Sequence, residues 1–467
     1  MILLSKEQKT KLQKLYLEKK FSELEFEIES ISNLKTRPAF LANLLGVVRL
    51  KKNYITDKDW IDSKELFLEA INKDPEDIDA LCNYANTSIK LRDYTDALKK
   101  LIEKKKLGYN SKVNELLARI YSFEGEIDKA VNLYKENEKN NGLTKTSASH
   151  FLASMNYQTD FSQNKYLNYC RKINNTFRIP QNEINNFKNF LFEKNLKVGF
   201  LSPDLKQHSV YYFLMSVIRE LKKNSIKVYA FNIGDPKNLD DISNFIKKDF
   251  DQWVDLHNIS DFDAANQIRE CKINILIDIT GYFSNNRFSI LKYKPAPLQI
   301  SWMGYVNTMG MEEIDYILAD PHLIKLEEEN LYSEKVLRMP DIWNSHCGIN
   351  ENIKVNYAPI IKNGYITFGC FNNFSKVSMS CINTWSKILN SVDNSKLIIK
   401  GSSSDSDIGI SRILKGFKNN NVNLDRVIFE TYKVDRKDHL EVYHNVDVCL
   451  DTFPYPGVTT SFEAIWM

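Results

Sequence analysis

The pattern with the clearest chemical meaning lies in segment 451–466, DTFPYPGVTTSFEAIW. A turn containing Gly457 leads into Thr459 and Thr460, and an apolar helical pattern follows. Hydroxyls and free backbone N–H groups at the start of a helix form an anion site. Glu463, one turn further on, could reach a sugar hydroxyl. The alternative is an ordinary helix start in which Thr459 serves only as the N-cap.

Two other polar residues come directly after strand-like runs. His208 follows the run 196–201, where a histidine can act as a general base or polarise a bound group. Lys376 follows the run 365–369, where its compact positive charge suits a phosphate. Each also has an ordinary interpretation, because a loop histidine can be satisfied by the backbone and a lysine by solvent.

Two glycine-containing loops are further candidates. Gly281 follows the run 273–278 and permits a close approach of the backbone. Segment 295–310, PAPLQISWMGYVNTMG, is expected to contain a strand that ends in a loop bounded by Gly304 and Gly310. Such a loop can place N–H groups against a ligand, although an ordinary turn would look the same.

Several common catalytic motifs are missing from the sequence. There is no GxxxxGK[ST], HExxH or GxSxG pattern, so P-loop hydrolysis, zinc proteolysis and serine hydrolysis lack support. The seven cysteines are scattered without a CxxC pair, which favours reduced thiols and argues against a zinc site.

The second half of the chain alternates continuous apolar runs with helical stretches, which predicts parallel sheets covered on both faces. The expected strands are 196–201, 228–232, 273–278, 365–369, 396–400, 426–429 and 446–451. A connector at 341–363 divides them into two α/β units. Ligands of such sheets bind at the carboxyl ends of the strands, so the candidate residues should lie close together.

Residues 1–140 have helical periodicity and contain a repeat. Matching residues recur 33 positions apart: Ala85 and Ala118, Ala97 and Ala130, and Leu101 and Tyr134. A period near 34 with small residues in both helices is typical of tetratricopeptide repeats. We expect three to four repeats, with a degenerate first unit over 10–38. A plain helical bundle is the alternative.

Composition narrows the class of protein. The 467 residues carry a net charge of +3, which gives no support to nucleic-acid binding. No apolar run reaches the roughly 18 residues of a membrane span, and the N-terminus does not resemble a signal peptide. We therefore expect a soluble, cytoplasmic protein.

After the repeats, seven collinear blocks resemble the O-linked N-acetylglucosamine transferase/SPINDLY family. The blocks are KVGFLSPDLKQHSV, INILIDITGYF, PAPLQISWMGYVNTMG, IDYILADP, LYSEKVLRMP, FGCFNNFSKV and DVCLDTFPYPGVTTSFEAIW, with HFLASMNY linking them to the repeats. The resemblance covers nearly the whole chain. It implies a two-lobed GT-B fold, a UDP-sugar donor, and inverting transfer to Ser/Thr hydroxyls of proteins without a metal or other cofactor.

The resemblance also assigns roles to individual residues, the first of which lie in the first lobe and in the loop after the run 365–369. His208 matches a histidine at the mouth of the active site, and Gly304 matches a glycine beside the donor sugar. Asn373 stands where a glutamine commonly contacts the diphosphate. Lys376 matches the lysine that neutralises the diphosphate, which makes His208 and Lys376 the expected catalytic residues. The identity of the group that deprotonates the acceptor hydroxyl stays open.

The remaining donor-binding residues come from the end of the chain. His439 falls where the family stacks a histidine on uracil, and Arg436 falls where a lysine or arginine lies near the base. Thr459 and Thr460 match a diphosphate-binding pair, and Glu463 matches an acidic residue at the ribose. Lysine, hydroxyl and N–H donors together would stabilise the leaving diphosphate.

Two departures from the family pattern flank the diphosphate loop: Val458 and Pro456, which could weaken donor binding or change the donor. The chain also stops inside a helix that precedes further elements in relatives. We therefore expect a fold of repeats over 1–145, a helical linker over 146–194, a first lobe on the acceptor side over 195–345 and a truncated nucleotide-sugar lobe over 346–467.

The expected function is transfer of N-acetylglucosamine from UDP-N-acetylglucosamine to Ser/Thr of a protein or peptide held in the repeat groove. Two alternatives remain open at this point: the same fold with GDP-fucose or UDP-glucose as donor, and an inactive tetratricopeptide adaptor.

Overall fold

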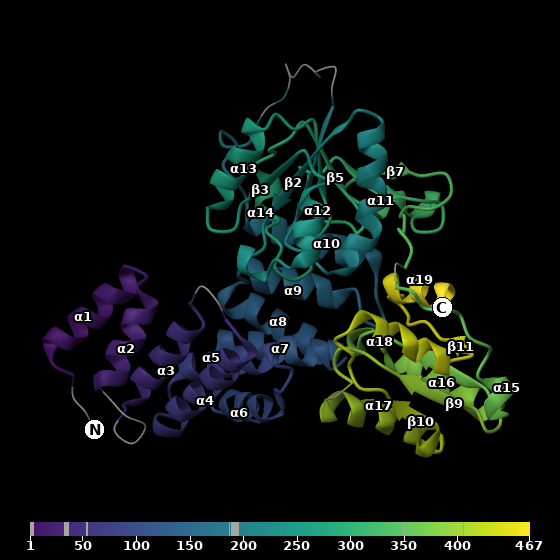
Figure 1. The fold of residues 1–467 in the computed structure, drawn as a ribbon, viewed down its shortest axis with the longest axis horizontal. Coiled ribbons are helices and arrows are strands. Elements are labelled where there is room, and N and C mark those ends of the chain that lie inside the picture. The colour runs from purple at the N-terminus through teal and green to yellow at the C-terminus, as the bar shows by residue number, and fades with distance from the viewer. Residues whose placement is uncertain are drawn as a thin grey trace.

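The computed structural model describes residues 4–31, 37–52, 55–185, 187, 196–349, 351–404 and 406–467. A helical array extends along the bottom of Figure 1 from the N-terminus toward the centre. One sheet-containing lobe lies above the end of this array, and a second, smaller lobe lies to its right. Three bodies therefore meet near the centre of the molecule.

The array consists of paired helices, and its described residues, 4–31, 37–52 and 55–176, contain no strand. Its helices are α1 (Lys6–Leu17), α2 (Phe21–Ile31), α3 (Ala39–Arg49), α4 (Asp57–Lys73), α5 (Ile78–Lys90), α6 (Thr95–Lys106), α7 (Ser111–Phe123), α8 (Ile127–Asn141), α9 (Lys145–Met155) and α10 (Gln163–Thr176). Consecutive helices pack against one another along the array, which is the arrangement expected of tetratricopeptide repeats.

Small residues let the paired helices approach closely, as the repeat pattern predicts. Ala85 of α5 and the equivalent Ala118 of α7 are fully buried, and so are Ala97 of α6 and the equivalent Ala130 of α8. A Cβ atom added to Gly46 would lie 2.6 Å from the ring of Phe67, so a larger residue would push α3 away from α4. The helices α9 and α10 occupy part of the segment expected as a linker, of which residues 186 and 188–194 lie outside the described residues.

The first lobe is built on a seven-stranded sheet with the order β3-β2-β1-β4-β5-β6-β7, and every neighbouring pair is parallel. Its strands are β1 (Lys197–Ser202), β2 (Lys227–Asn232), β3 (Gln252–Asp255), β4 (Ile275–Asp278), β5 (Leu298–Ser301), β6 (Tyr316–Ala319) and β7 (Lys335–Arg338). Its α-helices are α11 (Ser209–Lys223), α12 (Asp241–Lys247), α13 (Asp261–Glu270) and α14 (Ser289–Lys292).

The second lobe has a four-stranded parallel sheet with the order β10-β9-β8-β11. Its strands are β8 (Thr367–Cys370), β9 (Lys396–Ile399), β10 (Val427–Phe429) and β11 (Val448–Cys449). Its helices are α15 (Ile360–Asn363), α16 (Met379–Ser391), α17 (Asp407–Asn419), α18 (Arg436–Glu441), α19 (Thr459–Trp466) and a short 3-10 helix η3 (Phe374–Lys376). Two parallel sheets after a helical array confirm the predicted fold class.

Strands β3, β6 and β7 were not among the strands expected from the sequence. Each has four residues, and β3 and β7 are the edges of the sheet, where one side of the strand is unpaired. The β3 sequence QWVD and the β7 sequence KVLR carry polar residues at both ends. These two edge strands lack the continuous apolar run that marks a central strand, whereas the β6 sequence YILA has such a run and was missed.

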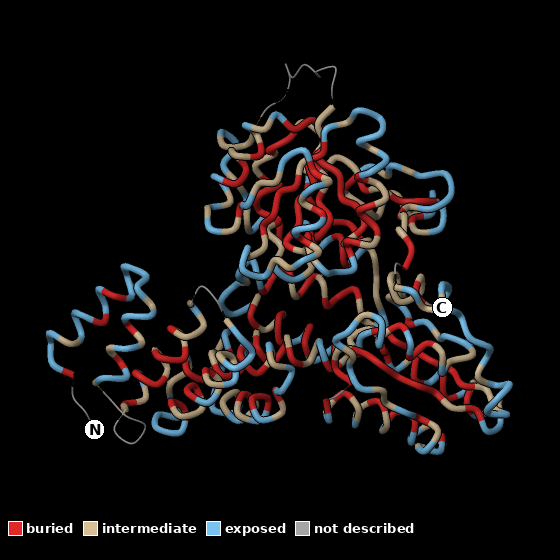
Figure 2. Tube along the Cα trace, viewed as in Figure 1, coloured by how far each residue is buried: buried red, intermediate tan, exposed pale blue. Residues whose placement is uncertain are grey.

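The array and the first lobe share one hydrophobic core. A single cluster of buried residues extends from Ala42 in α3 to Ile314 beyond β5. Figure 2 shows buried backbone continuing from the central array helices up into the first lobe. Helices α1 and α2 belong to a separate cluster, which begins at Leu4 and includes Leu66 of α4.

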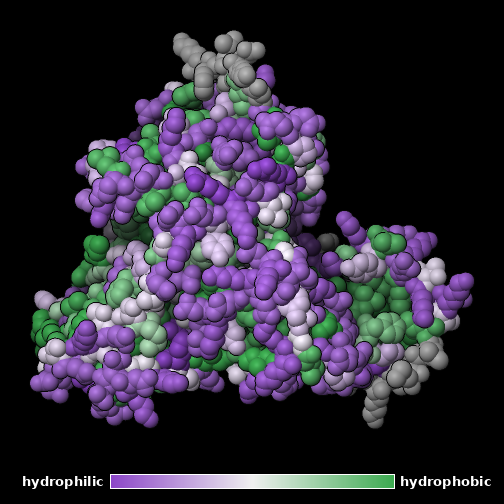
Figure 3. Space-filling view, turned by 180° about the vertical axis from the view of Figure 1, so that it is seen from behind, coloured by the Kyte–Doolittle hydropathy of each residue, from purple (hydrophilic) through white to green (hydrophobic). Residues whose placement is uncertain are grey.

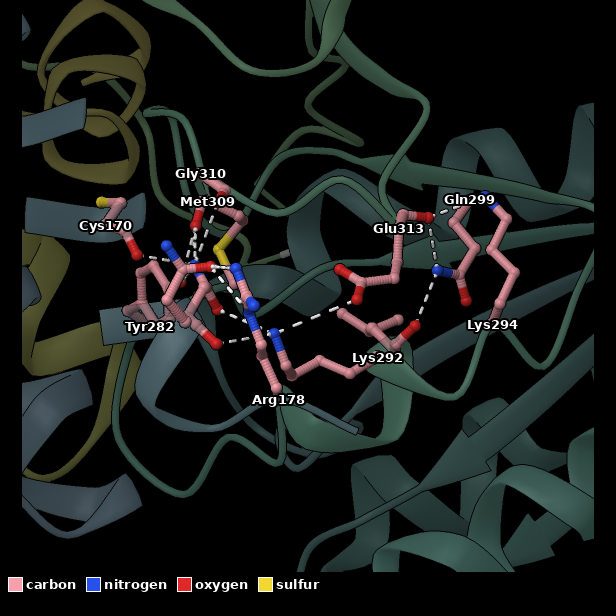
Figure 4. A network of polar contacts seen from close by, with 12 residues as sticks. Cys170, Arg178, Tyr282, Lys292, Lys294, Gln299, Met309, Gly310 and Glu313 are labelled. Carbon is pink, nitrogen blue, oxygen red and sulfur yellow. Dashed lines mark hydrogen bonds and ion pairs between the residues drawn. The ribbon is translucent and has the colours of Figure 1, made fainter. Parts of the chain in front are cut away.

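Buried polar groups fix how α10 sits on the first lobe. The amide nitrogen of Asn174 donates to the carbonyl oxygen of Met309 at 2.9 Å and to the hydroxyl of Tyr282 at 2.9 Å. Tyr282 in turn donates to the same Met309 carbonyl at 2.6 Å, as Figure 4 shows. The ammonium of Lys292, which is 3% exposed, lies 4.0 Å from the carboxylate of Glu313.

A second set of buried polar contacts holds the loop after β5. Asn156, at the end of α9, donates to the Tyr305 hydroxyl at 2.8 Å and accepts from the Asn307 amide at 2.7 Å. The hydroxyls of Tyr166 and Tyr305 also share a hydrogen bond. Array helices therefore position the segment that begins at Gly304.

The face shown in Figure 3 is mostly hydrophilic, with hydrophobic side chains gathered over the N-terminal helices at the right of that view. Among the described residues, none of the helices combines the length and the apolar composition that crossing a bilayer requires.

We expect Asn174→Ala to lower the free energy of unfolding by about 1–3 kcal/mol, because the carbonyl oxygen of Gly310, to which the Asn174 amide donates at 3.2 Å, loses this donor. Urea unfolding followed by circular dichroism and tryptophan fluorescence measures this change. Asn175→Ala is the matched control, since Asn175 is exposed on the same helix and should change stability by less than about 0.5 kcal/mol. Equal effects of the two substitutions would contradict the role of the buried amide.

Candidate active site

A cavity of about 470 Å³ lies where the two lobes and the array meet. Its walls come from loops that follow β1, β4 and β5 of the first sheet and β8 and β11 of the second. The strand order reverses between β1 and β4 and again between β8 and β11. Ligands of parallel sheets bind at such reversal points, so this cavity is the candidate site on topology alone.

Six of the residues predicted from the sequence line this cavity together. They are His208, Gly304, Asn373, Lys376, Thr459 and Thr460. They come from four loops that are far apart in the sequence, as expected from their positions at strand ends. In the described part of the chain, no three His, Cys, Asp or Glu side chains are grouped as a metal site.

His208 is the N-cap residue of α11 and is exposed to the cavity. Its Nδ1 accepts a hydrogen bond from the backbone N–H of Val210 at 3.4 Å. A neutral imidazole with Nδ1 as acceptor carries its proton on Nε2. In this tautomer Nε2 is a hydrogen-bond donor.

Gly304 brings two loops of the first lobe into direct contact. A Cβ atom at this position would lie 1.9 Å from the carbonyl oxygen of Ile279, which follows β4. The same loop is ordered by Asp278, whose carboxylate accepts from the N–H of Gly281 at 2.9 Å and of Thr280 at 3.3 Å. Burial raises the pKa of Asp278 to about 6. The wall is therefore backbone, with no space for a side chain at Gly304.

Asp451 organises the second-lobe side. It accepts hydrogen bonds from four groups: the Asn372 amide at 3.1 Å, the Thr452 N–H at 2.7 Å, the Gly457 N–H at 2.8 Å and the Ser461 hydroxyl at 3.2 Å. The Thr460 hydroxyl donates to the Asn372 side-chain oxygen at 3.1 Å. These bonds tie the loop after β8 to the loop after β11.

Lys376 provides the positive charge in the cavity wall. Its ammonium donates to the carbonyl oxygen of Pro456 at 3.0 Å and lies 5.0 Å from the ring centroid of Tyr455. Burial lowers the pKa of Lys376 to about 8, and the Asp451 carboxylate opposes the shift. At neutral pH the side chain is still mostly protonated, and it can pair with an anion.

The start of α19 adds N–H donors beside Lys376. Thr459 is the first helical residue, and the N-cap position is held by Val458, which makes no side-chain capping bond. The interpretation of Thr459 as a mere N-cap is therefore wrong. The N-terminus of a helix carries partial positive charge, so the start of α19 and Lys376 place positive charge on the same wall of the cavity.

The other three predicted residues form a separate polar cluster and do not line the cavity. The buried carboxylate of Glu463 pairs with Arg436 and lies 3.0 Å from Nε2 of His439. Burial alone would raise the pKa of Glu463. The hydrogen bond to His439 and the charge of Arg436 outweigh this effect and hold the pKa of Glu463 below its usual value. The assignment of Arg436 and His439 to the nucleotide base, and of Glu463 to the ribose, stays a prediction.

Lys400 belongs to this cluster and was not predicted. Its ammonium contacts Nδ1 of His439, and burial lowers its pKa to about 8. Lys400 is the last residue of the expected strand 396–400, whereas β9 ends at Ile399, so its position at a strand end could be seen in the sequence.

The array also reaches the site. Tyr157, between α9 and α10, lines the cavity and packs edge-on against Tyr455 with ring centroids 5.1 Å apart. Arg412 of α17 donates to the carbonyl oxygens of Glu124 at 2.8 Å and Phe374 at 3.3 Å. The turn after α7 therefore supports η3, which carries Lys376.

Comparisons with known proteins agree with this architecture. The family model described as Glycosyl transferase family 41 matches residues 122–350 and 353–467, and a tetratricopeptide repeat model matches residues 66–99. The probable UDP-N-acetylglucosamine–peptide N-acetylglucosaminyltransferase SPINDLY of Petunia hybrida is 28% identical over 69% of this chain and 35% of its own length. The corresponding SPINDLY protein of Arabidopsis thaliana is 31% identical over 59% of this chain and 30% of its own length.

The chain thus spans about a third of the length of these curated relatives. Among solved structures, a mutant of the Thermobaculum terrenum O-GlcNAc transferase superposes with a TM-score of 0.81 and 22% identity. The match covers 88% of this chain and 78% of that one, which establishes a shared fold.

We expect Gly304→Ala to cost about 3 kcal/mol of stability, because the added methyl overlaps a backbone carbonyl that cannot move independently. Thermal and urea unfolding measure the loss. Ser284→Ala is the control, since Ser284 is an exposed residue of the same cavity wall and should change stability by less than about 0.5 kcal/mol. A Gly304→Ala protein as stable as the parent would contradict the close backbone approach.

Proposed function

Because the chain belongs to glycosyltransferase family 41, we propose that it transfers N-acetylglucosamine from UDP-N-acetylglucosamine to Ser or Thr hydroxyls of a protein or peptide. One observation carries the proposal: Lys376 and the uncapped start of α19 face the same cavity at the reversal points of both sheets. The activity of a nucleotide-sugar transferase requires an anion site at this place.

In the proposed reaction, the acceptor hydroxyl attacks the anomeric carbon from the face opposite the diphosphate, and the configuration is inverted. The bond to the leaving diphosphate breaks, and its electron pair stays on the phosphate oxygen. Lys376, the α19 N–H groups and the hydroxyls of Thr459 and Thr460 would stabilise that developing charge. Protein groups supply the positive charge in this mechanism, so we propose that no metal takes part.

We propose that His208 positions a reactant in this reaction. With the proton on Nε2, it would donate a hydrogen bond to an oxygen of the sugar or the acceptor. The hydroxyl proton would then leave to another acceptor. Tyr157 brings the array to the cavity edge, and we propose that the acceptor chain enters from the array side.

Lys376→Ala should reduce kcat/KM for transfer about 100- to 1000-fold, because it removes a preorganised charge at the leaving group. Transfer from UDP-N-acetylglucosamine to Ser-containing peptides is followed by mass spectrometry, and folding by circular dichroism. Lys415→Ala is the matched control, because Lys415 is an exposed lysine of the same lobe. Parent-like turnover by the Lys376 variant would place the diphosphate elsewhere.

Calorimetric titration with UDP, GDP and their sugar conjugates completes this test. Binding of UDP and UDP-N-acetylglucosamine in preference to GDP-fucose supports the proposed donor. Tight binding of GDP without binding of UDP would replace the donor, and no binding of any nucleotide by the folded protein would reject the activity.

The affinity for UDP should fall as the pH rises above 8. In the free protein Lys376 loses its proton through a pKa of about 8, whereas a bound diphosphate would raise that pKa. Between the two values binding takes up a proton, and Kd increases by up to about tenfold per pH unit. Lys376→Met should abolish this slope. If Lys400→Met abolishes the pH dependence of Kd and Lys376→Met does not, the titrating group is Lys400 of the neighbouring cluster, whose pKa is also about 8.

A further inference from the structure

A second cavity of about 210 Å³ lies beside the candidate active site, and all three bodies of the molecule line it. The residues of the array that matter here are Arg119, Tyr134 and His150. Four other lining residues, Tyr157, Phe283, Ser284 and Asn373, also line the larger cavity. The two cavities therefore share a wall.

Two residues that line this small cavity each have a buried polar atom without a hydrogen-bond partner among the described residues. One is the hydroxyl of Tyr134, whose side chain is 0% exposed, and the other is Nδ1 of His150. The Tyr134 ring packs against Phe151 with centroids 5.9 Å apart. This contact explains why an aromatic ring is buried here, but it gives the hydroxyl no hydrogen-bond partner. A buried hydroxyl without a partner costs about 1–3 kcal/mol, so its presence points to a bound group.

The charge of the cavity is positive. Among the described residues that line it, Arg119 alone carries a full charge, and one of its nitrogens donates to the Asn86 side-chain oxygen at 2.7 Å. Burial and the nearby Arg119 lower the pKa of His150 to about 4, so His150 is neutral at physiological pH. Glu115, one turn before Arg119 on α7, does not line the cavity, but its carboxylate interacts electrostatically with both Arg119 and Tyr134.

We infer that this cavity is an acceptor subsite that receives the carboxylate side chain of an Asp or Glu close in sequence to the modified Ser or Thr. The inference rests on the proposed function. A guanidinium matches the planar geometry of a carboxylate, and the Tyr134 hydroxyl is a free donor that can complete the set. The aromatic rings of Phe123 and Phe283 suit the methylene groups that carry the carboxylate.

The position of the cavity explains why the occupant belongs to the acceptor. Its volume is less than half that of the neighbouring cavity, which the nucleotide-sugar is proposed to fill. Its charged wall comes from α7 of the array, the body from which the acceptor is proposed to enter. A side chain held there fixes the distance along the acceptor chain to the hydroxyl at the sugar.

The test uses fluorescent peptides with one Ser on an Ala/Gly background and one Asp placed at each position from −4 to +4, each compared with its Asn counterpart. Binding in the presence of UDP is measured by fluorescence anisotropy, and transfer by mass spectrometry. At one position, or at two adjacent ones, Asp should bind about tenfold more tightly than Asn. Arg119→Gln should reduce this ratio to about one, and Arg119→Glu should favour Lys instead.

Two controls separate the subsite from general effects. Lys112→Gln removes one positive charge from the same helix, but its ammonium pairs with Asp79 at 2.7 Å and does not line the cavity, so the Asp preference should persist. Tyr134→Phe should weaken the Asp preference about threefold without lowering the melting temperature. A hydroxyl with only a structural role would lower the melting temperature and leave the preference unchanged.

Each outcome is decisive. No Asp preference at any position, a preference that survives Arg119→Gln, or no peptide binding at all would overturn the inference. Failure of the proposed function looks different: UDP fails to bind or no sugar is transferred, while an Arg119-dependent preference in peptide binding would still support the subsite. UDP affinity should be the same in all Arg119 variants.

Discussion

The rest of the structure depends on a buried polar joint between the helical array and the first lobe. Amide and hydroxyl groups removed from water must find partners, and the side chains of Asn156 and Asn174 find theirs on the loops of the lobe. Those bonds form in only one relative orientation of the two bodies. Because Tyr305 directly follows Gly304, the joint also fixes the backbone wall of the candidate active site.

The second lobe is attached in a different way. Its helix α19 packs against the first lobe through Phe462, whose ring stacks on His346 at 5.3 Å and meets Phe213 of α11 at 5.5 Å. Arg436 lies over the ring of Tyr212 with 4.4 Å to the centroid. The helix whose N-terminal N–H groups face the cavity is thus held by aromatic contacts with the opposite lobe, and the two halves of the candidate site are aligned through it.

Much of this arrangement could be predicted from the sequence, for a physical reason. Strands buried on both faces read as continuous apolar runs, and polar residues just after them must gather at one edge of a parallel sheet. His208 and Lys376 were found on that basis. Short edge strands gave no comparable signal, and neither did Tyr157, which reaches the cavity only because the array folds back on the lobes.

Other features depend on pairings that no single sequence reveals. Nothing in the spacing of Arg436, His439 and Glu463 indicates that the three side chains contact one another rather than line the larger cavity. Likewise, the cap of α19 could not be assigned to Val458, since Thr459 is the better capping residue by type. Three-dimensional neighbours decide between such alternatives.

The division of the hydrophobic core has a consequence for how this architecture can evolve. Helices α1 and α2 pack in a cluster with residues of α3 and α4, whereas α7 to α10 share a core with the first lobe. Changes in the N-terminal repeat units therefore act first on α3 and α4, and the catalytic scaffold lies further along the array. The last units have become part of that scaffold, so selection for new partners can act at one end of the array while the other end stays constant.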